Sequence, residues 1–476
     1  MLQIKIRKAV LKLLLLTFSA ISLNALSWPA LAQSSASDES RITALRNTIQ
    51  MMTAETQQLE DIAQIHRLQR AYGYYIDKGY WNEAADLFAD DASMEIGVDG
   101  VYHGQARIRE LLIRHGGGNN STGPGLPFGQ INHHMQLQPV VTIAEDGQSA
   151  YARWRDFSLL GQYQESAFWA DAIMENVYSK ADGIWKIQSF HLFPNFVAPY
   201  EGGWASLEPV AQDWRSDIAM EFPADANPTV IYKPFPDVFV PPFHYENPAQ
   251  ANSAVANIPL PENQGGAIGE LEEMVIAYAH ELDNLRMEKS LENLQAMYGY
   301  YIDKGMWDEA ASLFAEDATY EFGQGGVYIG AERIKAVMSR MAPEGLAQGV
   351  LNNYPMLQPI ISVAEDNLSA KARWRSDVQL NNNEESFWGG GVYENEYVIE
   401  NGIWKISKLH YYVTFWAEYD KGWIDGTVPM ANPNQEFPPD LPPTEVYGSQ
   451  PEVYLFPFHY PHLVTGEEHR GKGEEQ

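Results

Sequence analysis

The chain carries one sequence pattern twice, and this repeat limits its possible folds more than any other feature. Residues 72–90 read YGYYIDKGYWNEAADLFAD and residues 298–316 read YGYYIDKGMWDEAASLFAE, with 15 of 19 positions identical. Further matches follow in the same order, up to Pro242–Tyr245, which recurs at 457–460. A repeat unit of about 215 residues predicts two copies of one folded module.

The order of patterns within a unit predicts an α+β module. Apolar residues at helical spacing precede Gly79, which ends the first helix. Asp146-Gly147 and Asp182-Gly183 are turn signals between later strands. Helices followed by an antiparallel meander are typical of the α+β class. The expected elements after the first helix are a short helix at 81–89, a hairpin at 93–102, a helix at 105–115, and strands near 131–144, 149–160, 166–179 and 184–193.

Long helical and Pro-rich segments flank each module. A leader helix is expected before each one, and the two leaders can pair with each other. The Pro-rich segments contain many aromatic residues, so we expect extended arms that lie against the modules rather than free linkers. The predicted organisation is a signal peptide 1–32, leader helix 33–64, module 1 at 65–205, Pro-rich arm 206–265, leader helix 266–290, module 2 at 291–425 and Pro-rich tail 426–476.

The first 32 residues have the pattern of a secretory signal. Lys5 and Arg7 begin a positive region, and Leu13–Leu26 is an apolar run too short to span a bilayer comfortably. Ala30-Leu31-Ala32 is a cleavage site of the small-x-small type, which makes Gln33 the expected mature N-terminus. We therefore expect a periplasmic or secreted protein; an uncleaved membrane anchor is the alternative.

Charge and cysteine content exclude several kinds of function. The net charge of -31 argues against nucleic acid and against anionic membrane surfaces, since both require a basic footprint. No contact with the membrane is expected after the signal is removed. The chain has no cysteine, so it has no disulfide, no thiol nucleophile and no cysteine-ligated metal.

Three motifs carry a resemblance to a known family. They are YxxxIDKGxWxEAAxLFAxDA, then Gly-x-Tyr-x-Gly, and later Gly-Ile-Trp-Lys-Ile. Together they resemble the SnoaL-like branch of the nuclear transport factor 2-like superfamily, over 65–200 and 291–420. The resemblance implies two tandem cones of helices packed on a curved antiparallel sheet, each around a pocket for a small hydrophobic or aromatic molecule. It also implies sheets that pair as an intramolecular pseudo-dimer, and assembly into a homo-oligomer stays open.

The same resemblance points to a catalytic pair. The branch includes scytalone dehydratase-type lyases, polyketide cyclases and relatives of ketosteroid isomerase, which move protons without a cofactor. It implies that His134 is the acid–base group and that Asp77, four residues before Trp81, faces the same cavity. A surface histidine, and an aspartate that only binds backbone amides at a turn, are the alternatives. His133 and His134 are adjacent on a strand, so only one of them can face the cavity.

Module 2 departs from this pattern, because Tyr354 stands where module 1 has His134. The two sites are therefore expected to differ, with module 1 the active one. On the last strand of each module, His191 and His410 are an even number of residues from Trp185 and Trp404, so they are expected on the same apolar face. On that face a histidine buried in the core is favoured over one that binds a ligand. The residues expected to contact substrate are Tyr72, Tyr75, His133, Trp154, Trp169, His191, Asp303, Tyr354, Trp374 and His410.

Some charged residues near the strands are expected to be exposed. Asp156 lies near a strand end, where a carboxylate is more often solvated than directed into a pocket. The arginines at 153, 155, 373 and 375 are expected to pair with the acidic surface, with a domain-interface role as the alternative. Adjacent histidines are poor joint ligands, so no metal is expected.

The sequence therefore favours an enzyme, a cofactor-independent lyase or isomerase acting on an aromatic or polycyclic molecule. Two other functions stay open. One is a binding protein for an apolar small molecule outside the cytoplasm. The other is a purely supporting role for module 2.

Overall fold

The computed structural model describes residues 38–116, 124–211, 213–245, 268–340, 342, 344–382 and 385–469. The expected signal peptide lies outside these residues. The chain divides into two compact units. The described part of unit 1 is 38–54 with 268–279, and unit 2 contains both modules.

Unit 1 is formed by the first turns of two long helices, α2 (Asp38–Lys78) and α6 (Ile268–Asp303). Ile49, Leu271 and Val275 form a buried apolar cluster between the two segments. Arg41 Nη2 lies 2.9 Å from Glu272 Oε1, in an exposed ion pair that adds little stability. The two leader segments thus contact each other mainly through apolar side chains.

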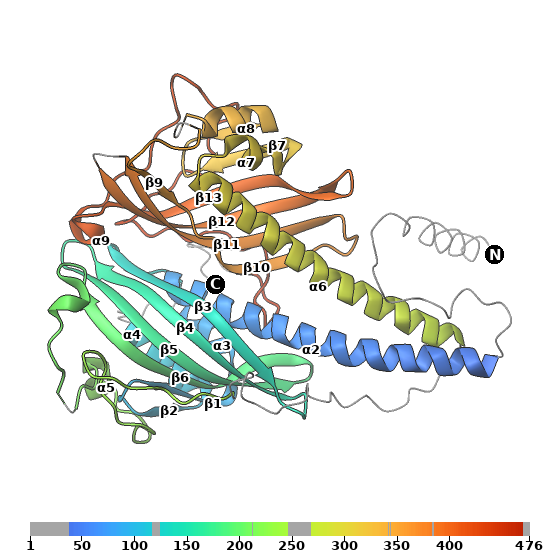
Figure 1. Cartoon of the computed structure of the whole chain (residues 1–476). Coiled ribbons are helices and arrows are strands. Elements are labelled where there is room, and N and C mark those ends of the chain that lie inside the picture. Colours follow the sequence, from blue (N-terminus) through green and yellow to red (C-terminus); the bar gives the residue numbers. More distant parts are fainter. Residues whose placement is uncertain are drawn as a thin grey trace. The chain divides into compact units, whose positions relative to one another are not determined.

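Module 1 places the end of α2 against a six-stranded sheet with the order β2-β1-β6-β5-β4-β3 (Figure 1). Gly79, with φ of +73°, ends α2 in a conformation that side chains with a Cβ rarely adopt. The remaining elements are α3 (Trp81–Asp86), β1 (Phe88–Ile96), β2 (Val101–His103), α4 (Gln105–His115), β3 (Gln130–Ile143), β4 (Ser149–Gln162), β5 (Ser166–Ala181) and β6 (Ile184–Pro199).

Two details of module 1 correct the expectations from sequence. The sheet is mixed rather than antiparallel, because β1 pairs in parallel with β6, the last strand of the meander. The second helix ends at Asp86 instead of Ala89. Phe88, which continues the helical pattern, pairs with Ile187 and begins β1. The backbone N–H and C=O groups of this segment form their hydrogen bonds with the edge of β6, so a further helical turn is not needed to satisfy them.

Module 2 repeats the arrangement with one broken strand. Pro355 stands where module 1 has Met135, and it has no N–H to donate to a neighbouring strand. The strand equivalent to β3 is therefore split into β9 and β10, both paired with β11. The elements are α7 (Trp307–Ser312), β7 (Phe314–Phe322), β8 (Val327–Ile329), α8 (Ala331–Met338), β9 (Val350–Asn353), β10 (Leu357–Val363), β11 (Ser369–Asn382), β12 (Ser386–Glu400) and β13 (Ile403–Glu418).

The Pro-rich segments contact the modules through aromatic side chains. In the first arm, which contains η1 (Gly203–Ser206) and α5 (Asp217–Glu221), Tyr232 packs on Phe193 of β6. The C-terminal tail, residues 426–469, follows α9 (Gly422–Asp425) and reaches module 1. Its buried residues Tyr447, Leu455, Phe456 and Tyr460 belong to the same apolar core as Tyr72. The tail of module 2 thus belongs to a core that contains residues of both modules, Tyr412 of module 2 among them.

The two modules also contact each other directly within unit 2. Ile131 and Leu159 of module 1 form a buried cluster with Phe415, Ala417 and Trp423 of module 2. These residues come from β3 and β4 on one side and from β13 and α9 on the other. Within the described ranges, no helix is long and apolar enough to cross a membrane.

Candidate active site

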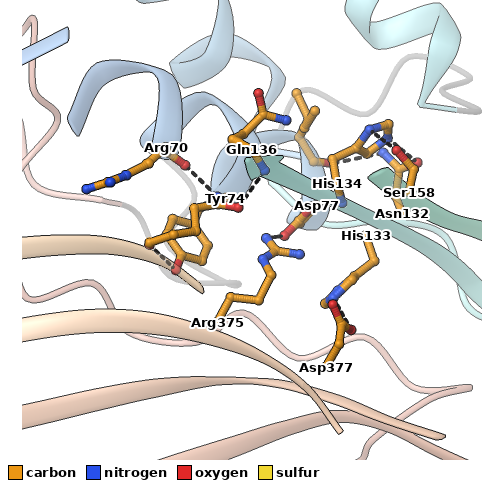
Figure 2. A network of polar contacts seen from close by, with 12 residues as sticks. Arg70, Tyr74, Asp77, Asn132, His133, His134, Gln136, Ser158, Arg375 and Asp377 are labelled. Atoms are coloured by element: carbon orange, nitrogen blue, oxygen red, sulfur yellow. Dashed lines mark hydrogen bonds and ion pairs between the residues drawn. The ribbon is translucent and has the colours of Figure 1, made fainter. Parts of the chain in front are cut away.

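Strand β3 directs its two adjacent histidines to opposite faces of the sheet (Figure 2). The ring of His134 turns toward Asp156 and Ser158 of β4, inside module 1. The ring of His133 turns toward module 2, where its Nε2 lies 2.9 Å from Asp377 Oδ1. This is the alternation expected of a strand. The two rings therefore belong to different environments.

The imidazole of His134 is held by a buried carboxylate. Its Nδ1 lies 3.0 Å from Asp156 Oδ1, and Ser158 Oγ contacts both groups. Gln136 Nε2 donates to the second carboxylate oxygen of Asp156 at 2.6 Å. The side chain of Asp156 is only 6% exposed, whereas that of His134 is 22% exposed. One side of the His134 ring is thus held by a buried carboxylate, while part of the side chain stays accessible to solvent.

These contacts determine the charge of Asp156 and the tautomer of His134. Burial alone would raise the pKa of Asp156, but the His134 charge and hydrogen bonds from His134, Ser158 and Gln136 outweigh burial and lower it. An ionised Asp156 only accepts, so Nδ1 of His134 carries a hydrogen and donates it. Nε2 is then the nitrogen free to exchange a proton. It lies 3.4 Å from Asn132 Oδ1.

Asp77, the predicted partner of His134, binds its backbone instead of its ring. Asp77 Oδ1 accepts the His134 N–H at 2.7 Å, and Oδ2 pairs with the buried Arg375 of module 2. Figure 2 shows Asp77 directed at Arg375. The carboxylate that holds the imidazole is Asp156, whose burial corrects the expectation that it is exposed. A catalytic role for Asp77 stays a prediction.

The link between Asp77 and Arg375 has a cause in the sequence of module 2. In module 1 the equivalent Arg155 pairs with Asp171 on the neighbouring strand, at 2.7 Å. Gly390 occupies the position of Asp171 in module 2, where a Cβ would lie 2.2 Å from the ring of Phe415. Arg375 therefore has no carboxylate at the position of Asp171 and pairs with Asp77. Arg373 and Arg375 are buried, which corrects the expectation that they lie on the surface.

Replacing Asp77 by alanine is expected to destabilise the protein by about 3–5 kcal/mol, because Arg375 would stay buried without its carboxylate. Asp303 is the matched control. It accepts the Tyr354 N–H at 2.6 Å just as Asp77 accepts that of His134, and no arginine pairs with it among the described residues. Asp303→Ala should cost only about 1 kcal/mol. Urea unfolding of both variants measures the difference, and equal losses would contradict the role given to Arg375.

One polar network recurs in both modules and is structural. In module 1, Gln69 Oε1 accepts from Tyr178 at 2.7 Å, and Trp154 Nε1 donates to Tyr178 at 3.1 Å. In module 2, Gln295, Tyr397 and Trp374 make the same contacts at 2.8 and 3.0 Å. All these groups are buried. Their recurrence in two modules with different interiors indicates that the network positions the helix on the sheet.

The polar residues around His134 do not recur. Module 2 has Tyr354 in place of His134 and Ser376 in place of Asp156. Gln136 and Ser158, which both bind Asp156, are replaced by residues that lack their hydrogen-bonding groups. These replacements are Met356 and Val378. The whole acid–base group is thus specific to module 1.

The interior of module 2 is filled by tyrosines. Tyr320, Tyr393 and Tyr411 are buried there, in place of two methionines and a leucine in module 1. The hollow that remains beside Tyr354 measures about 20 Å³, near the volume of one water molecule. Tyr354 itself is 5% exposed. Module 2 therefore has little room for a substrate in its interior.

The remaining predicted residues of module 1 lie in three places. Tyr72 is close to the His134 group, since burial and the charge of Asp156 both raise its pKa. Its ring packs on Phe190, 5.2 Å between centroids. Tyr75 points to the C-terminal tail, with its hydroxyl 3.3 Å from His469 Nε2. Trp169 lies on the far face of the sheet, beside module 2. Only Tyr72 is thus brought near the histidine.

His191 and His410 lie on the opposite face from the one expected. A bulge at Gln188 shifts the pairing of β6, so that Trp185 and Phe190 enter the core while His191 lies on the other face of the sheet. The equivalent bulge in β13 has the same effect on His410. Burial lowers the pKa of His191 to about 4 and of His410 to about 3, so both are neutral at pH 7. Neither approaches the His134 group.

Comparison with known proteins identifies the family. No curated protein matches the chain. Similar solved structures include a Novosphingobium aromaticivorans protein provisionally assigned as a scytalone dehydratase, with 21% identity, a TM-score of 0.27, and coverage of 32% of this chain and 95% of that one. Hexachlorocyclohexane dehydrochlorinase LinA-type3 from Novosphingobium barchaimii has 18% identity and a TM-score of 0.26, with coverage of 29% of this chain and 93% of that one. ActVI-ORFA from Streptomyces coelicolor has 14% identity and a TM-score of 0.24, with coverage of 27% of this chain and 96% of that one. The family model described as SnoaL-like domain matches residues 57–191 and 283–410, together more than half of the chain. The chain therefore belongs to the SnoaL-like domain family and contains two copies of the domain.

Proposed function

We propose that module 1 is a cofactor-independent acid–base catalyst, a lyase or isomerase of the dehydratase or cyclase type. Its substrate would be a small aromatic or polycyclic molecule. One observation carries the proposal: Nδ1 of His134 is held by the buried carboxylate of Asp156, which leaves Nε2, 3.4 Å from Asn132 Oδ1, to exchange a proton. Histidine is the side chain most often used for proton transfer to and from a reacting group.

The proposed reaction uses Nε2 of His134 twice. Nε2 first takes a proton from a carbon beside a carbonyl group, and the electron pair of the C–H bond moves toward the carbonyl oxygen. Asp156 stabilises the resulting imidazolium through its contact with Nδ1. The imidazolium then returns the proton either to a departing hydroxyl, which leaves as water, or to another carbon of the substrate. The first outcome is a dehydration and the second an isomerisation.

Each neighbour of His134 has a defined task in this scheme. Asn132 Oδ1 accepts a hydrogen bond from Nε2 when that nitrogen is protonated. Gln136 and Ser158 keep Asp156 ionised and in place. Asp77 fixes the backbone of β3 at His134. Module 2 supports this arrangement through Arg375 and its tail, and its own interior is not proposed to be catalytic.

The proposal is tested by proton exchange, which needs no knowledge of the natural substrate. The purified protein is incubated with 2-tetralone in D2O, and loss of the α-carbon hydrogens is followed by proton NMR. Exchange above the buffer rate is expected, because the ketone offers an aromatic ring system and an acidic C–H beside a carbonyl. Exchange at the buffer rate for 2-tetralone and for a panel of related ketones would contradict the acid–base proposal.

Export is part of the proposal and rests on residues 1–32 of the sequence. When the full chain is expressed in an export-competent bacterial host, mass spectrometry of the periplasmic protein should find Gln33 at or near the N-terminus. A mature chain that keeps Lys5 to Leu26 would instead indicate an anchored protein. Processing at Gln33 would agree with a function in the periplasm or outside the cell.

A further inference from the structure

A cavity of about 660 Å³ lies between the sheets of the two modules, separate from the interior of either one. Met135 and Leu159 of module 1 line one side, and Leu357 and Asp377 of module 2 line the other. Its volume falls within the range of small-molecule sites, about 300–1,000 Å³. Trp204 and Tyr419, both about half exposed, also line it and mark its rim. The cavity is therefore large enough for a multi-ring molecule.

The two modules contribute matching aromatic walls to this cavity. Trp169 stacks on Tyr200 with 5.4 Å between centroids, and the equivalent Trp388 stacks on Tyr419 at 6.0 Å. The two tryptophans meet edge to face at 5.4 Å. Flat apolar surfaces of this kind suit a ring system.

The two walls differ in polarity at two equivalent positions. Phe157 and Leu159 of module 1 correspond to Asp377 and Gln379 of module 2, and all four residues line the cavity. The repeat thus places two apolar residues opposite two polar ones. A molecule with one polar end and an otherwise apolar body would bind in a single orientation.

Asp377 has an oxygen without a partner. Its side chain is 7% exposed, and Oδ1 lies 2.9 Å from His133 Nε2. Oδ2 is buried and has no hydrogen-bond partner within the described residues. A buried carboxylate oxygen without a donor costs free energy, so a ligand that supplies a donor gains by satisfying it.

We propose that this cavity between the modules binds an apolar ring system that carries a hydroxyl group, and that the hydroxyl donates to the carboxylate of Asp377. The site is distinct from the His134 group, which lies on the other face of β3. It requires both modules, because the apolar wall and the acceptor come from different halves of the chain. This gives the tandem arrangement a binding function that neither module has alone.

Burial around Asp377 favours a neutral hydroxyl over a cationic group. The guanidinium of Arg375 is buried and close enough for its charge to interact with that of Asp377. His133 already donates to, or shares a proton with, the other oxygen. An ammonium group would lose much more hydration free energy than a neutral hydroxyl on entering this poorly solvated place.

The test compares two probes that share a naphthalene ring and differ in whether its oxygen carries a hydrogen or a methyl group. Equilibrium dialysis measures the binding of 2-naphthol and of 2-methoxynaphthalene to the full chain. The wild-type protein should bind 2-naphthol about 10- to 100-fold more tightly, since only the naphthol donates to the carboxylate. Equal affinity for the two probes would overturn the proposal.

Three variants locate the binding. Asp377→Asn keeps an oxygen for His133 but loses the free carboxylate oxygen, so the preference for 2-naphthol should fall to about that of the apolar ring alone. Leu159→Trp fills the cavity from the opposite wall and should weaken both probes. His134→Ala tests whether the probes bind inside module 1 instead. Thermal unfolding checks that each variant is folded, and Asp377→Asn decides the question if Leu159→Trp is not. Loss of binding in His134→Ala, with binding kept in Asp377→Asn, would place the probes inside module 1 and overturn the proposal.

Discussion

Replacing His134 by alanine is expected to lower the rate of α-proton exchange in 2-tetralone by about 100-fold or more, the usual contribution of a general acid or base. The reason is that His134 Nε2 is the group proposed to carry the proton. The variant should stay folded, because the His134 side chain is partly exposed and the Asp77 contact uses its backbone N–H. Exchange rates by NMR and thermal unfolding by circular dichroism measure the two effects separately.

Two further variants separate catalysis from support. Asp156→Asn keeps the shape of the site but replaces the carboxylate that fixes the Nδ1–H tautomer, so activity should fall by less than in His134→Ala. Tyr354→Phe alters the equivalent position of module 2 and should leave the exchange rate unchanged. A loss in Tyr354→Phe as large as in His134→Ala would assign the chemistry to module 2 and contradict the proposal.

Ending the chain after Val446 is expected to prevent stable folding of module 1. The removed segment includes Tyr447, Leu455, Phe456 and Tyr460, all buried in the core that contains Tyr72. Burial of a large apolar side chain contributes about 1.5–3 kcal/mol. The combined loss is on the order of 6–12 kcal/mol, comparable to the whole free energy of unfolding of a typical domain, about 5–15 kcal/mol. Limited proteolysis should cut within 65–205 in the truncated chain.

Point variants make the same test without deleting a segment. Phe456→Ala should cost about 3–5 kcal/mol, because its ring is 2% exposed and lies 4.2 Å from Nζ of the buried Lys78. Phe243, in the first arm, is the matched control. Its ring is 55% exposed and contacts Arg153, so Phe243→Ala should cost less than about 1 kcal/mol. Similar losses in both variants would show that the tail does not complete the core.

The α+β fold could be predicted from sequence because its signals are local and occur twice. The repeat defines the module, glycine ends α2, and Asp146-Gly147 forms the turn between β3 and β4, where Asp146 Oδ1 accepts from Gln148 N at 2.8 Å. What could not be predicted depends on single extra residues or distant partners. The bulge at Gln188 reverses the side on which His191 lies, and parity counting along a strand has no means of detecting it.

Only part of the candidate site could be predicted from the sequence. His134 could be found from the resemblance, but its carboxylate partner was assigned to Asp77, on the neighbouring helix. Asp156 carried a signal that was available: it is a serine in module 2, as expected if it serves only the histidine that module 2 lacks. The partner of Arg375 carried no such signal, because the residue that holds it comes from the other module.

The path of the C-terminal tail sets the order in which the two halves can become complete. Tyr75 and His469, which meet through the tyrosine hydroxyl, are 394 residues apart in the chain. During synthesis a domain near the N-terminus usually folds first. Here the ribosome makes module 1 first but supplies the last part of its core only when translation is almost finished. A premature stop codon close to the end of the gene would therefore damage a site encoded near its beginning, and module 1 could not be transplanted into another protein without its distant final segment.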